Sequence, residues 1–488
     1  MSTTIRSEFT FATAGDQAKA LAERRISAVE LLDQAIARIE ALDGTYNAVV
    51  VRDFDRARDA AKAADAALAQ GEKKPLLGVP MTVKESYNVA GLVTSWGFPD
   101  NKNHRATQDA VAVTRLKGAG AVIMGKTNVP VSLADWQSYN DIYGQTNNPW
   151  NPAMSPGGSS GGAAAALAAG YVGLEIGSDI GGSVRVPAHF CGVFGHKPSY
   201  GIIPYRGHDL FDSDRAPDVS VAGPLARSAT DLALALDLLA GPMEDEAVGY
   251  RLELPPPRHA ALKDFRILLL DQHPMVPTDA AVTGALDRLA EKLAKAGANV
   301  TRAGNRIPDL VATADAYIQL LMSEMTARMP DRAVADLKQR VAAFAPDDRS
   351  WEARWLRSTV LDHRAWIIAD LKRAELRRAW RLLFRDWDVV LAPPFPTPAF
   401  PHDHTPDQLD RRAIINGNPV PYTSQILWPS IASVAMLPAT VAPVERSETG
   451  LPIGVQIIGP YLEDRTTIAF AQFLAREFGG FTPPPGLA

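Results

Sequence analysis

Hydrophobic residues recur at helical spacing near the start of the chain. Ser27 and Glu30 have the spacing of a capping box, in which each side chain satisfies a free backbone N–H group at a helix start. Gly44 is a residue type that commonly follows a helix. The pattern predicts an amphipathic helix that starts at Ser27 and ends before Gly44, with an apolar face made of Ile26, Val29, Leu32, Ile36 and Ile39.

Short apolar runs and helical patterns alternate further along the chain. Residues 265–270, the leucines of 286–293 and Val300 predict a strand–helix–strand unit, the building block of a parallel sheet. A further helix is predicted from Ser228 to just before Gly241. Other short strands are predicted at 77–83, 121–124, 389–392 and 453–458. The predicted class is therefore α/β.

The region 309–387 has a helical pattern that is rich in tryptophan and methionine. Most of these large side chains are expected to be core, and a few to line a pocket; they are Met322, Met325, Trp355, Trp366 and Trp380. A proline-rich connection follows at 393–406. Because composition marks no linker, we predict one continuous domain over 1–488.

Composition narrows the function classes. The chain has 488 residues, 46% of them hydrophobic, which is enough for a large core. Its net charge of -5 gives no basic excess for nucleic acid or an anionic membrane. The first 17 residues lack a secretory leader pattern, and the alanine-rich stretch from Ala163 is too short to span a bilayer. With Cys191 as its single cysteine, the chain is expected in the cytoplasm.

Two short motif matches are set aside by their context. Residues 120–127 fit the phosphate-loop pattern, but the intervening Ala-Val-Ile-Met predicts a buried strand, and Pro130 obstructs the helix that should follow. Residues 158–162 fit the nucleophile elbow of α/β-hydrolases, with Ser160 as nucleophile. The loop before them is rich in proline and asparagine, so the strand that an elbow needs is missing.

A much longer match runs through residues 155–198. It comprises Ser155-Pro-Gly-Gly-Ser159-Ser160-Gly-Gly, then Gly177-Ser-Asp179-Ile-Gly181-Gly182-Ser183-Val-Arg185-Val-Pro187, then Gly192-Val-Phe-Gly195-His-Lys197-Pro198. Flanking matches are Gly78-Val-Pro-Met-Thr-Val-Lys84-Glu, Gly125-Lys-Thr-Asn-Val-Pro130, Gly144-Gln-Thr-Asn-Asn-Pro-Trp150 and Gly450-Leu-Pro-Ile-Gly-Val-Gln456-Ile-Ile-Gly459. The chain resembles the amidase signature family over roughly residues 17 to 480, with the signature core at about 75–200. The resemblance implies a central mixed β-sheet flanked by helices on both faces.

The resemblance also implies the catalytic residues. Amide hydrolysis by acyl transfer needs a nucleophile, a base, an acid for the leaving amine and donors for the oxyanion. In the family pattern Ser183 is the nucleophile, Ser159 relays the proton and Lys84 is the base. The relay serine is reached through a cis peptide, which Gly158–Ser159 would supply here. No histidine, metal or other cofactor is needed.

Lys84 can act as a base only if its amine is neutral. The unperturbed pKa of lysine, ~10.4, is too high for a base near neutrality. The apolar residues before Lys84 predict the end of a buried strand, where burial lowers the pKa of an amine. The neutral amine could then take the proton of Ser183 through Ser159 and return it to the leaving nitrogen.

The segment before the nucleophile is expected to form the oxyanion hole. Gly181 and Gly182 carry no side chain, so that N–H groups of residues 180–183 can turn toward one oxygen. Ile180, Gly181 and Gly182 are the expected donors. Support of the loops by hydrogen bonds or ion pairs, without a part in the chemistry, is expected from Ser160, Asp179 and Arg185.

The loop 127–133 resembles the fatty acid amide hydrolase branch in its Thr-Asn-Val-Pro stretch. In that register, Leu133 stands where the branch contacts substrate near the nucleophile. Many amidases carry a glutamate two or three residues after the Thr-Asn pair, and Val131 and Ser132 stand there instead. This departure bears on how polar substrate ends are recognised.

Two groups of residues resemble metal ligands without a zinc-like spacing. They are His189, Cys191 and His196, and the loop cluster His402, Asp403 and His404. No metal site is predicted at either.

The expected function is hydrolysis of an uncharged or apolar aryl or alkyl carboxamide by the lone chain, without cofactor. Two alternatives share the same catalytic core: a carbamate or ester hydrolase, and the glutamine-hydrolysing subunit of a tRNA amidotransferase. Expected partners are a small amide substrate and, as an open possibility, a second copy of the chain.

Overall fold

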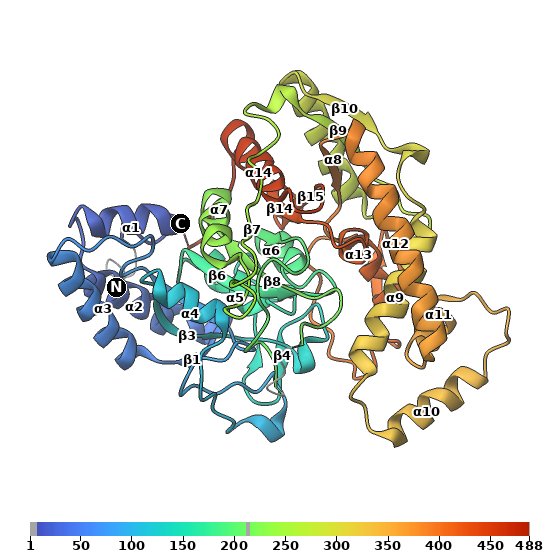
Figure 1. The fold of residues 1–488 in the computed structure, drawn as a ribbon, viewed down its shortest axis with the longest axis horizontal. Coiled ribbons are helices and arrows are strands. Elements are labelled where there is room, and N and C mark those ends of the chain that lie inside the picture. Colours follow the sequence, from blue (N-terminus) through green and yellow to red (C-terminus); the bar gives the residue numbers. More distant parts are fainter. Residues whose placement is uncertain (1–6, 211–214, 488) are drawn as a thin grey trace.

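The computed structural model describes residues 7–210 and 215–487, and its centre is a large mixed β-sheet (Figure 1). The strand order is β10-β9-β11-β15-β14-β7-β8-β6. The pairs β10–β9 and β9–β11 are parallel and the other neighbours are antiparallel. The strands are β6 (Leu174–Asp179), β7 (Phe194–Lys197), β8 (Val221–Ala226), β9 (Arg266–Leu269), β10 (Asn299–Arg302), β11 (Val389–Ala392), β14 (Ala439–Arg446) and β15 (Pro452–Ile458).

Both faces of this sheet are covered, because side chains of its central strands alternate between two cores. Ile267 and Leu269 of β9 pack into the core that contains α7, α8 and α14, whereas Leu268 packs into the core that contains α9, α12 and α13. The helices are α1 (Ala14–Ala22), α2 (Ala28–Tyr46), α3 (Phe54–Ala69), α4 (Val111–Gly118), α5 (Gly161–Ala168), α6 (Arg185–Cys191), α7 (Ala229–Leu239), α8 (Ala280–Lys295), α9 (Leu310–Thr326), α10 (Asp331–Ala342), α11 (Trp351–Ser358), α12 (His363–Asp386), α13 (Leu427–Val434) and α14 (Asp464–Phe478). The expected α/β sheet with helices on both faces is confirmed.

A three-stranded sheet in the order β1-β3-β2 stands beside the large one. It consists of β1 (Val49–Arg52), β2 (Pro80–Lys84) and β3 (Val122–Thr127). Strand β2 lies against β6, so that the end of β2 comes close to the end of β6. Two hairpins complete the strands: β4 (Tyr139–Asn140) with β5 (Gly144–Gln145), and β12 (Arg412–Ile415) with β13 (Asn418–Pro421).

Most predicted elements are present near their predicted bounds. The unit β9–α8–β10 is a parallel strand–helix–strand unit, β11 coincides with residues 389–392, and α7 lies between Ser228 and Gly241. The region 309–387 forms α9 to α12, with Trp380 fully buried.

The predicted end of the N-terminal helix is wrong. The capping box of Ser27 and Glu30 is present, but α2 continues through Gly44 to Tyr46. Asn47 provides the left-handed residue that ends the helix, with a φ of 49°. The carboxylate of Asp43 accepts hydrogen bonds from the N–H groups of Ala48 and Val49 just beyond this end. Among residues other than glycine, asparagine is one of those that adopt this conformation most often, and the Asp43 bonds help to fix it there.

Both rejected motifs have the structures expected of them. Residues 122–127 form the buried strand β3, and no strand precedes Ser160 within residues 155–160. Among the described helices, none is long and apolar enough to cross a membrane. Residues 1–6, where the N-terminal segment without a leader pattern begins, lie outside the described part of the chain.

Candidate active site

Lys84 is the last residue of β2 and is completely buried. Its neighbours in the strand, Met81 and Val83, are equally buried, which confirms the expected dry environment. The Lys84 Nζ donates to Ser159 Oγ at 2.7 Å and to Ser178 Oγ at 2.9 Å. The structure thus joins residues of β2, the loop before α5 and the end of β6 in one hydrogen-bonded cluster.

Burial lowers the pKa of Lys84 to about 7, although the carboxylates of Asp179 and Glu175 act in the opposite direction. Burial also raises the pKa of Glu175 to about 8, which weakens its charge near neutrality. A substantial fraction of the Lys84 amine is therefore neutral near pH 7. A neutral amine beside a hydroxyl group can accept its proton.

Ser159 follows a cis peptide bond at Gly158, as expected. A Cβ at Gly158 would lie 2.5 Å from the carbonyl oxygen of Asp135 and 2.6 Å from that of Gln137. Only glycine fits between these backbone groups. The close approach holds Ser159, which is 1% exposed, next to the Lys84 amine.

Ser183 lies in the short segment between β6 and α6. Both elements belong to the green central part of Figure 1. Gly182 before it has a φ of 98°, a conformation that favours glycine. The N–H of Gly182 donates to Asp179 Oδ1 at 2.9 Å. Among the described residues, the N–H groups of Ile180, Gly181 and Ser183 have no hydrogen-bond acceptor.

Asp179 and Arg185 form a buried ion pair that braces this segment. Arg185 Nη2 and Nε donate to the two Asp179 carboxylate oxygens at 2.8 and 3.0 Å, and both side chains are fully buried. Burial would raise the pKa of Asp179, but the Arg185 charge and hydrogen bonds outweigh it and lower the pKa to about 2. The guanidinium also donates to groups on α13 and β15, namely the Pro429 carbonyl, Ser433 Oγ and Gln456 Oε1.

The backbone of Ser160 connects the loop before α5, which carries Ser159, to the segment between β6 and α6, which carries Ser183. Its N–H donates to the carbonyl of Ser183 at 3.1 Å, and its Oγ lies 3.4 Å from the Ser178 carbonyl. These contacts place Ser160 beside the cluster without a bond to Lys84.

Replacing Arg185 by leucine should destabilise the protein severely. The Asp179 carboxylate would remain buried without its counter-charge, at a cost of about 3–5 kcal/mol in the free energy of unfolding. Thermal and urea unfolding of Arg185→Leu beside the wild type measure this loss. An exposed arginine, Arg476, gives the matched control, since Arg476→Leu should change stability by less than about 1 kcal/mol. Equal stability of both variants would contradict the bracing role.

Ser159, Ser178 and Ser183 line one pocket of about 510 Å³. Much of its wall is apolar and comes from several loops and from the end of α9: Trp96, Phe98, Leu133, Ile180, Met325 and Met329. Leu133, which the family resemblance places near the substrate, lines this pocket and has a φ of 58°. The charged part of the wall includes Arg215 and Glu324, which pair with each other at 2.7 Å.

Ser178 and His208 are site residues that the sequence analysis did not single out. Ser178 accepts a hydrogen bond from the Lys84 amine, as Ser159 does. His208 lies in the pocket wall, and its Nε2 is 2.8 Å from Ser86 Oγ. Ser178 stands inside the signature one residue before Asp179, so its hydroxyl was a signal available in the sequence. Nothing in the local sequence indicated His208.

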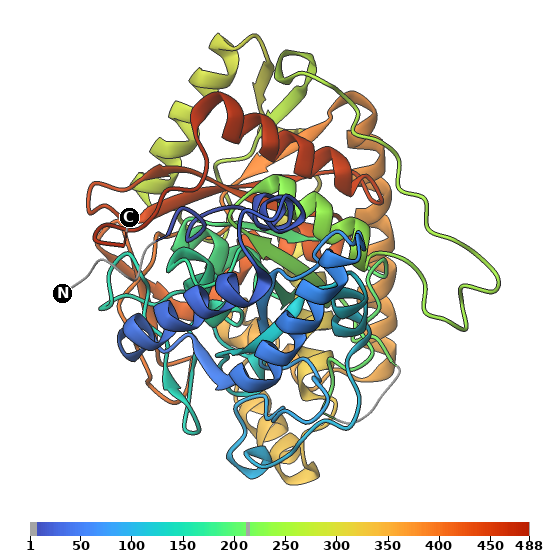
Figure 2. The same ribbon diagram turned by 90° about the vertical axis from the view of Figure 1, so that its left-hand side faces the viewer.

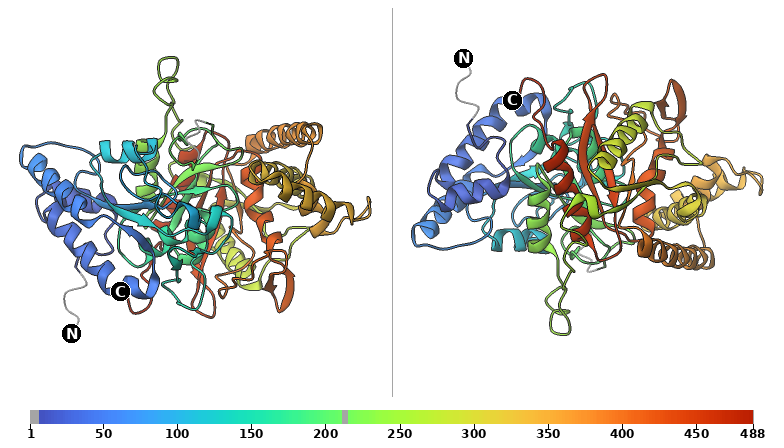
Figure 3. Two further views of the ribbon diagram at one scale, coloured as in Figure 1. Left: turned by 90° about the horizontal axis from the view of Figure 1, so that it is seen from below. Right: turned by 90° about the horizontal axis from the view of Figure 1, so that it is seen from above.

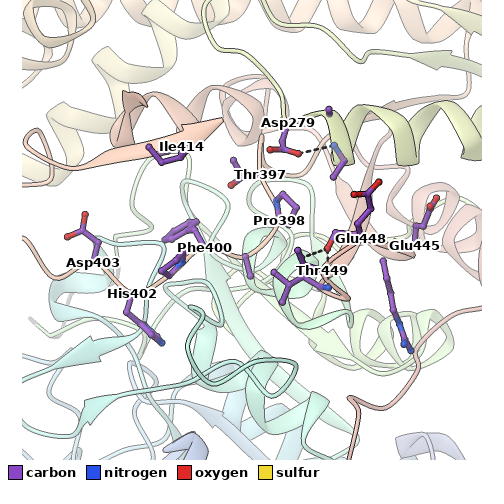
Figure 4. A pocket seen from close by; sticks show the side chains of 18 of the residues that line it. Asp279, Thr397, Pro398, Phe400, His402, Asp403, Ile414, Glu445, Glu448 and Thr449 are labelled. Atoms are coloured by element: carbon purple, nitrogen blue, oxygen red, sulfur yellow. Dashed lines mark hydrogen bonds between the residues drawn. The ribbon is translucent and has the colours of Figure 1, made fainter. Parts of the chain in front are cut away.

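The histidines of the two rejected metal groups have structural contacts. His189 lies between the Thr397 carbonyl and the Gly454 N–H, and His196 between Thr440 and Asp464. His402 and Asp403 belong to a separate open pocket of about 970 Å³, where they lie across from Glu445 and Glu448 (Figure 4). Within the described ranges, no group of three or more His, Cys, Asp or Glu residues could hold a metal ion.

Comparison with known proteins places the chain among amidases. The family described as Amidase matches residues 30–468. The indoleacetamide hydrolase of Bradyrhizobium diazoefficiens is 36% identical over 460 residues, which cover 93% of this chain and 84% of that protein. A component of the glutamyl-tRNA(Gln) amidotransferase of Anaeromyxobacter sp. (strain K) is 33% identical, and the match covers 95% of this chain and 96% of that protein.

A solved structure has the same fold over nearly the whole chain. It is described as a vestigial protein complex that reveals the evolutionary origins of an s-triazine catabolic enzyme. The TM-score is 0.80 at 31% identity, with 96% of this chain and 99% of that chain covered.

Proposed function

We propose, because the chain belongs to the amidase family, that it hydrolyses apolar aryl or alkyl carboxamides through an acyl-enzyme on Ser183. Family membership makes it a hydrolase of carbon–nitrogen bonds in non-peptide amides. The observation that carries the proposal is the contact between the buried Lys84 amine and Ser159, in a pocket that Ser183 also lines.

In the proposed mechanism the neutral Lys84 amine takes the proton of Ser159 as Ser159 takes that of Ser183. The Ser183 oxygen attacks the amide carbonyl, and the N–H groups of Ile180, Gly181 and Ser183 stabilise the oxyanion. The proton then returns by the same route to the leaving nitrogen, and the C–N bond breaks. Water attacks the resulting ester in the same way and releases the carboxylic acid.

The substrate class rests on the wall of the pocket and on one relative. Aromatic and aliphatic side chains near the serines favour an apolar acyl group, because each buried CH₂ contributes about 0.8 kcal/mol. The relative named indoleacetamide hydrolase is named for an amide with an aromatic ring, which a pocket of about 510 Å³ accommodates.

Two alternatives use the same residues. Carbamate or ester hydrolysis needs the same nucleophile and oxyanion donors, so this core does not separate it from amide hydrolysis. The second alternative is hydrolysis of glutamine within a tRNA amidotransferase. The similarity of the chain to an amidotransferase component favours it. It predicts that the chain depends on partner proteins.

The purified chain should hydrolyse an aryl amide such as an anilide, or indoleacetamide, without added protein. Glutamine should be turned over at least about 100-fold less efficiently, because its ammonium and carboxylate groups would have to give up water against the apolar part of the pocket wall. Initial rates for an anilide, a primary aryl amide, an aryl carbamate, an ester and glutamine measure this preference. Glutamine hydrolysis that appears only with amidotransferase partner proteins would overturn the proposal.

The Leu133→Ala variant tests the proposed apolar contact with the substrate in the same rate measurements. Loss of this side chain from the pocket wall should lower kcat/KM for aryl amides by about 10-fold, because apolar contact with the acyl group is lost. Acetamide, whose single methyl group offers little apolar surface for contact with Leu133, serves as the control substrate and should be affected much less.

A further inference from the structure

A segment between α7 and β9 projects from the body of the protein. Figures 2 and 3 show it as a long green loop that extends beyond every neighbouring element. Residues 244–251, which we call the arm, are all exposed. The arm carries two large apolar side chains, and Val248 is 91% exposed and Tyr250 55% exposed. A cluster of exposed apolar side chains can mark an interaction site, and here two large ones stand two residues apart on one projecting segment.

Both ends of the arm are fastened to the body. Arg115 donates to the carbonyls of Leu239, Gly241 and Pro242 before the arm. After it, Leu252 and Leu254 pack against the core. Arg258 then donates to the carbonyls of Phe384 and Trp387 at the end of α12. The arm therefore projects from a fixed base that adjoins the C-terminal end of α12.

Helix α12 exposes an apolar stripe on the same side of the molecule. At 100° per residue, four exposed apolar side chains, which we call the apolar stripe, fall within about 100° of one another: Ile367, Ile368, Leu371 and Leu382. The same sector also carries exposed charged side chains between and beside them, namely Arg364, Glu375, Arg378 and Arg385. The opposite face of α12 packs against α9 through Ala369, Leu376 and Trp380. In Figure 2 the long orange helix α12 and the arm stand on the same margin of the molecule.

The charges of the two surfaces are opposite. The arm holds three consecutive acids, Glu244, Asp245 and Glu246, against one basic residue, Arg251. The exposed residues of α12 include six basic side chains and two acidic ones: Arg364, Lys372, Arg377, Arg378, Arg381 and Arg385, with Glu375 and Asp386. An acidic arm with an apolar tip thus complements a basic helix with an apolar stripe.

We propose that two copies of the chain form a two-fold symmetric dimer, in which the arm of each copy packs across α12 of the other. The arm is fastened beside the end of its own α12 and extends away from the body, so its apolar tip has no stripe to cover on its own chain. A two-fold interface requires both complementary surfaces on one side of the molecule, as they are here. Each contact then occurs twice, and no open surface remains for a filament.

Sedimentation velocity of the full chain tests this arrangement. The wild type should sediment as a dimer at micromolar concentration, and Ile368→Asp or deletion of residues 245–250 should shift it to monomer. Ile414→Asp is the matched control, because Ile414 is 61% exposed against 58% for Ile368 and lies on the β12–β13 hairpin. Hydrolytic activity and the thermal transition of each variant show that the fold is retained.

Charge reversal gives a test that loss of folding cannot imitate. Glu244→Lys with Asp245→Lys in the arm should weaken the dimer at least about 10-fold, and so should Arg378→Glu with Arg381→Glu on α12. All four changes in one chain should restore it. A monomeric wild type, a dimer that survives both Ile368→Asp and the deletion, equal dissociation by Ile414→Asp, or a fourfold variant without rescue would each overturn the proposal.

Discussion

Ser183→Ala should lower kcat/KM for an aryl amide by at least about 10⁴-fold, because the only hydroxyl that can become the acyl carrier in the proposed mechanism is removed. Mass spectrometry of the wild type with a slowly hydrolysed aryl ester should show an acyl adduct on the peptide that contains Ser183. The alanine variant should show none.

Ser220→Ala is the control for this loss. Ser220 lines the same pocket, and its Oγ lies 2.9 Å from the hydroxyl of Tyr205. Tyr205 in turn contacts Ser178, so among the described residues Ser220 adjoins the Lys84 cluster only through Tyr205. Its replacement should change kcat/KM by less than about 10-fold. If Ser183→Ala kept more than a tenth of wild-type activity with its fold intact, Ser183 would not be the nucleophile.

Lys84→Arg should lower kcat/KM by about 10³-fold or more, because a guanidinium keeps its proton at any accessible pH and cannot serve as a base. In the wild type the amine must be neutral to act. With its pKa lowered to about 7, kcat/KM should therefore rise with pH, reach half its maximum near pH 7 and level off above pH 8. A profile of kcat/KM between pH 5 and 9 measures the midpoint.

A substitution of Lys197 is the control that distinguishes the loss of a base from the loss of any buried lysine. Burial also lowers the pKa of Lys197 to about 7, but its Nζ donates to the Pro198 carbonyl and not to a serine. Lys197→Met should lower stability and leave the midpoint of the pH profile unchanged. A wild-type rate that stays constant between pH 5 and 9 would rule out Lys84 as the base.

The sequence predicts elements well where the apolar pattern is local. Strand β11 occupies the predicted residues because a short run of aliphatic side chains fits a strand buried on both faces. The end of α2 was mispredicted, because Gly44 and Asn47 both qualify as stop signals and only tertiary contacts decide between them. Asn47 donates to carbonyls of Tyr143 and Gln145, almost a hundred residues away, which a local pattern does not contain.

The candidate site is less evident from physical pattern alone. The burial of Lys84 follows from the apolar residues around it, but its partners, Ser159 and Ser178, are 75 and 94 residues away in the chain. Only family resemblance links such positions from sequence. The bond from the Gly182 N–H to Asp179 is a detail of one turn that resemblance does not resolve, since glycine permits several orientations of the peptide.

The partners of the Arg185 guanidinium are synthesised after Arg185 itself, so the segment that carries Ser183 is braced only late in synthesis. This side chain, two residues after Ser183, is held by groups at positions 429, 433 and 456, on α13 and β15. A nascent chain on the ribosome contains both serines and Lys84 long before those groups emerge. We therefore expect the growing polypeptide not to hydrolyse cellular amides until α13 and β15 have packed against Arg185.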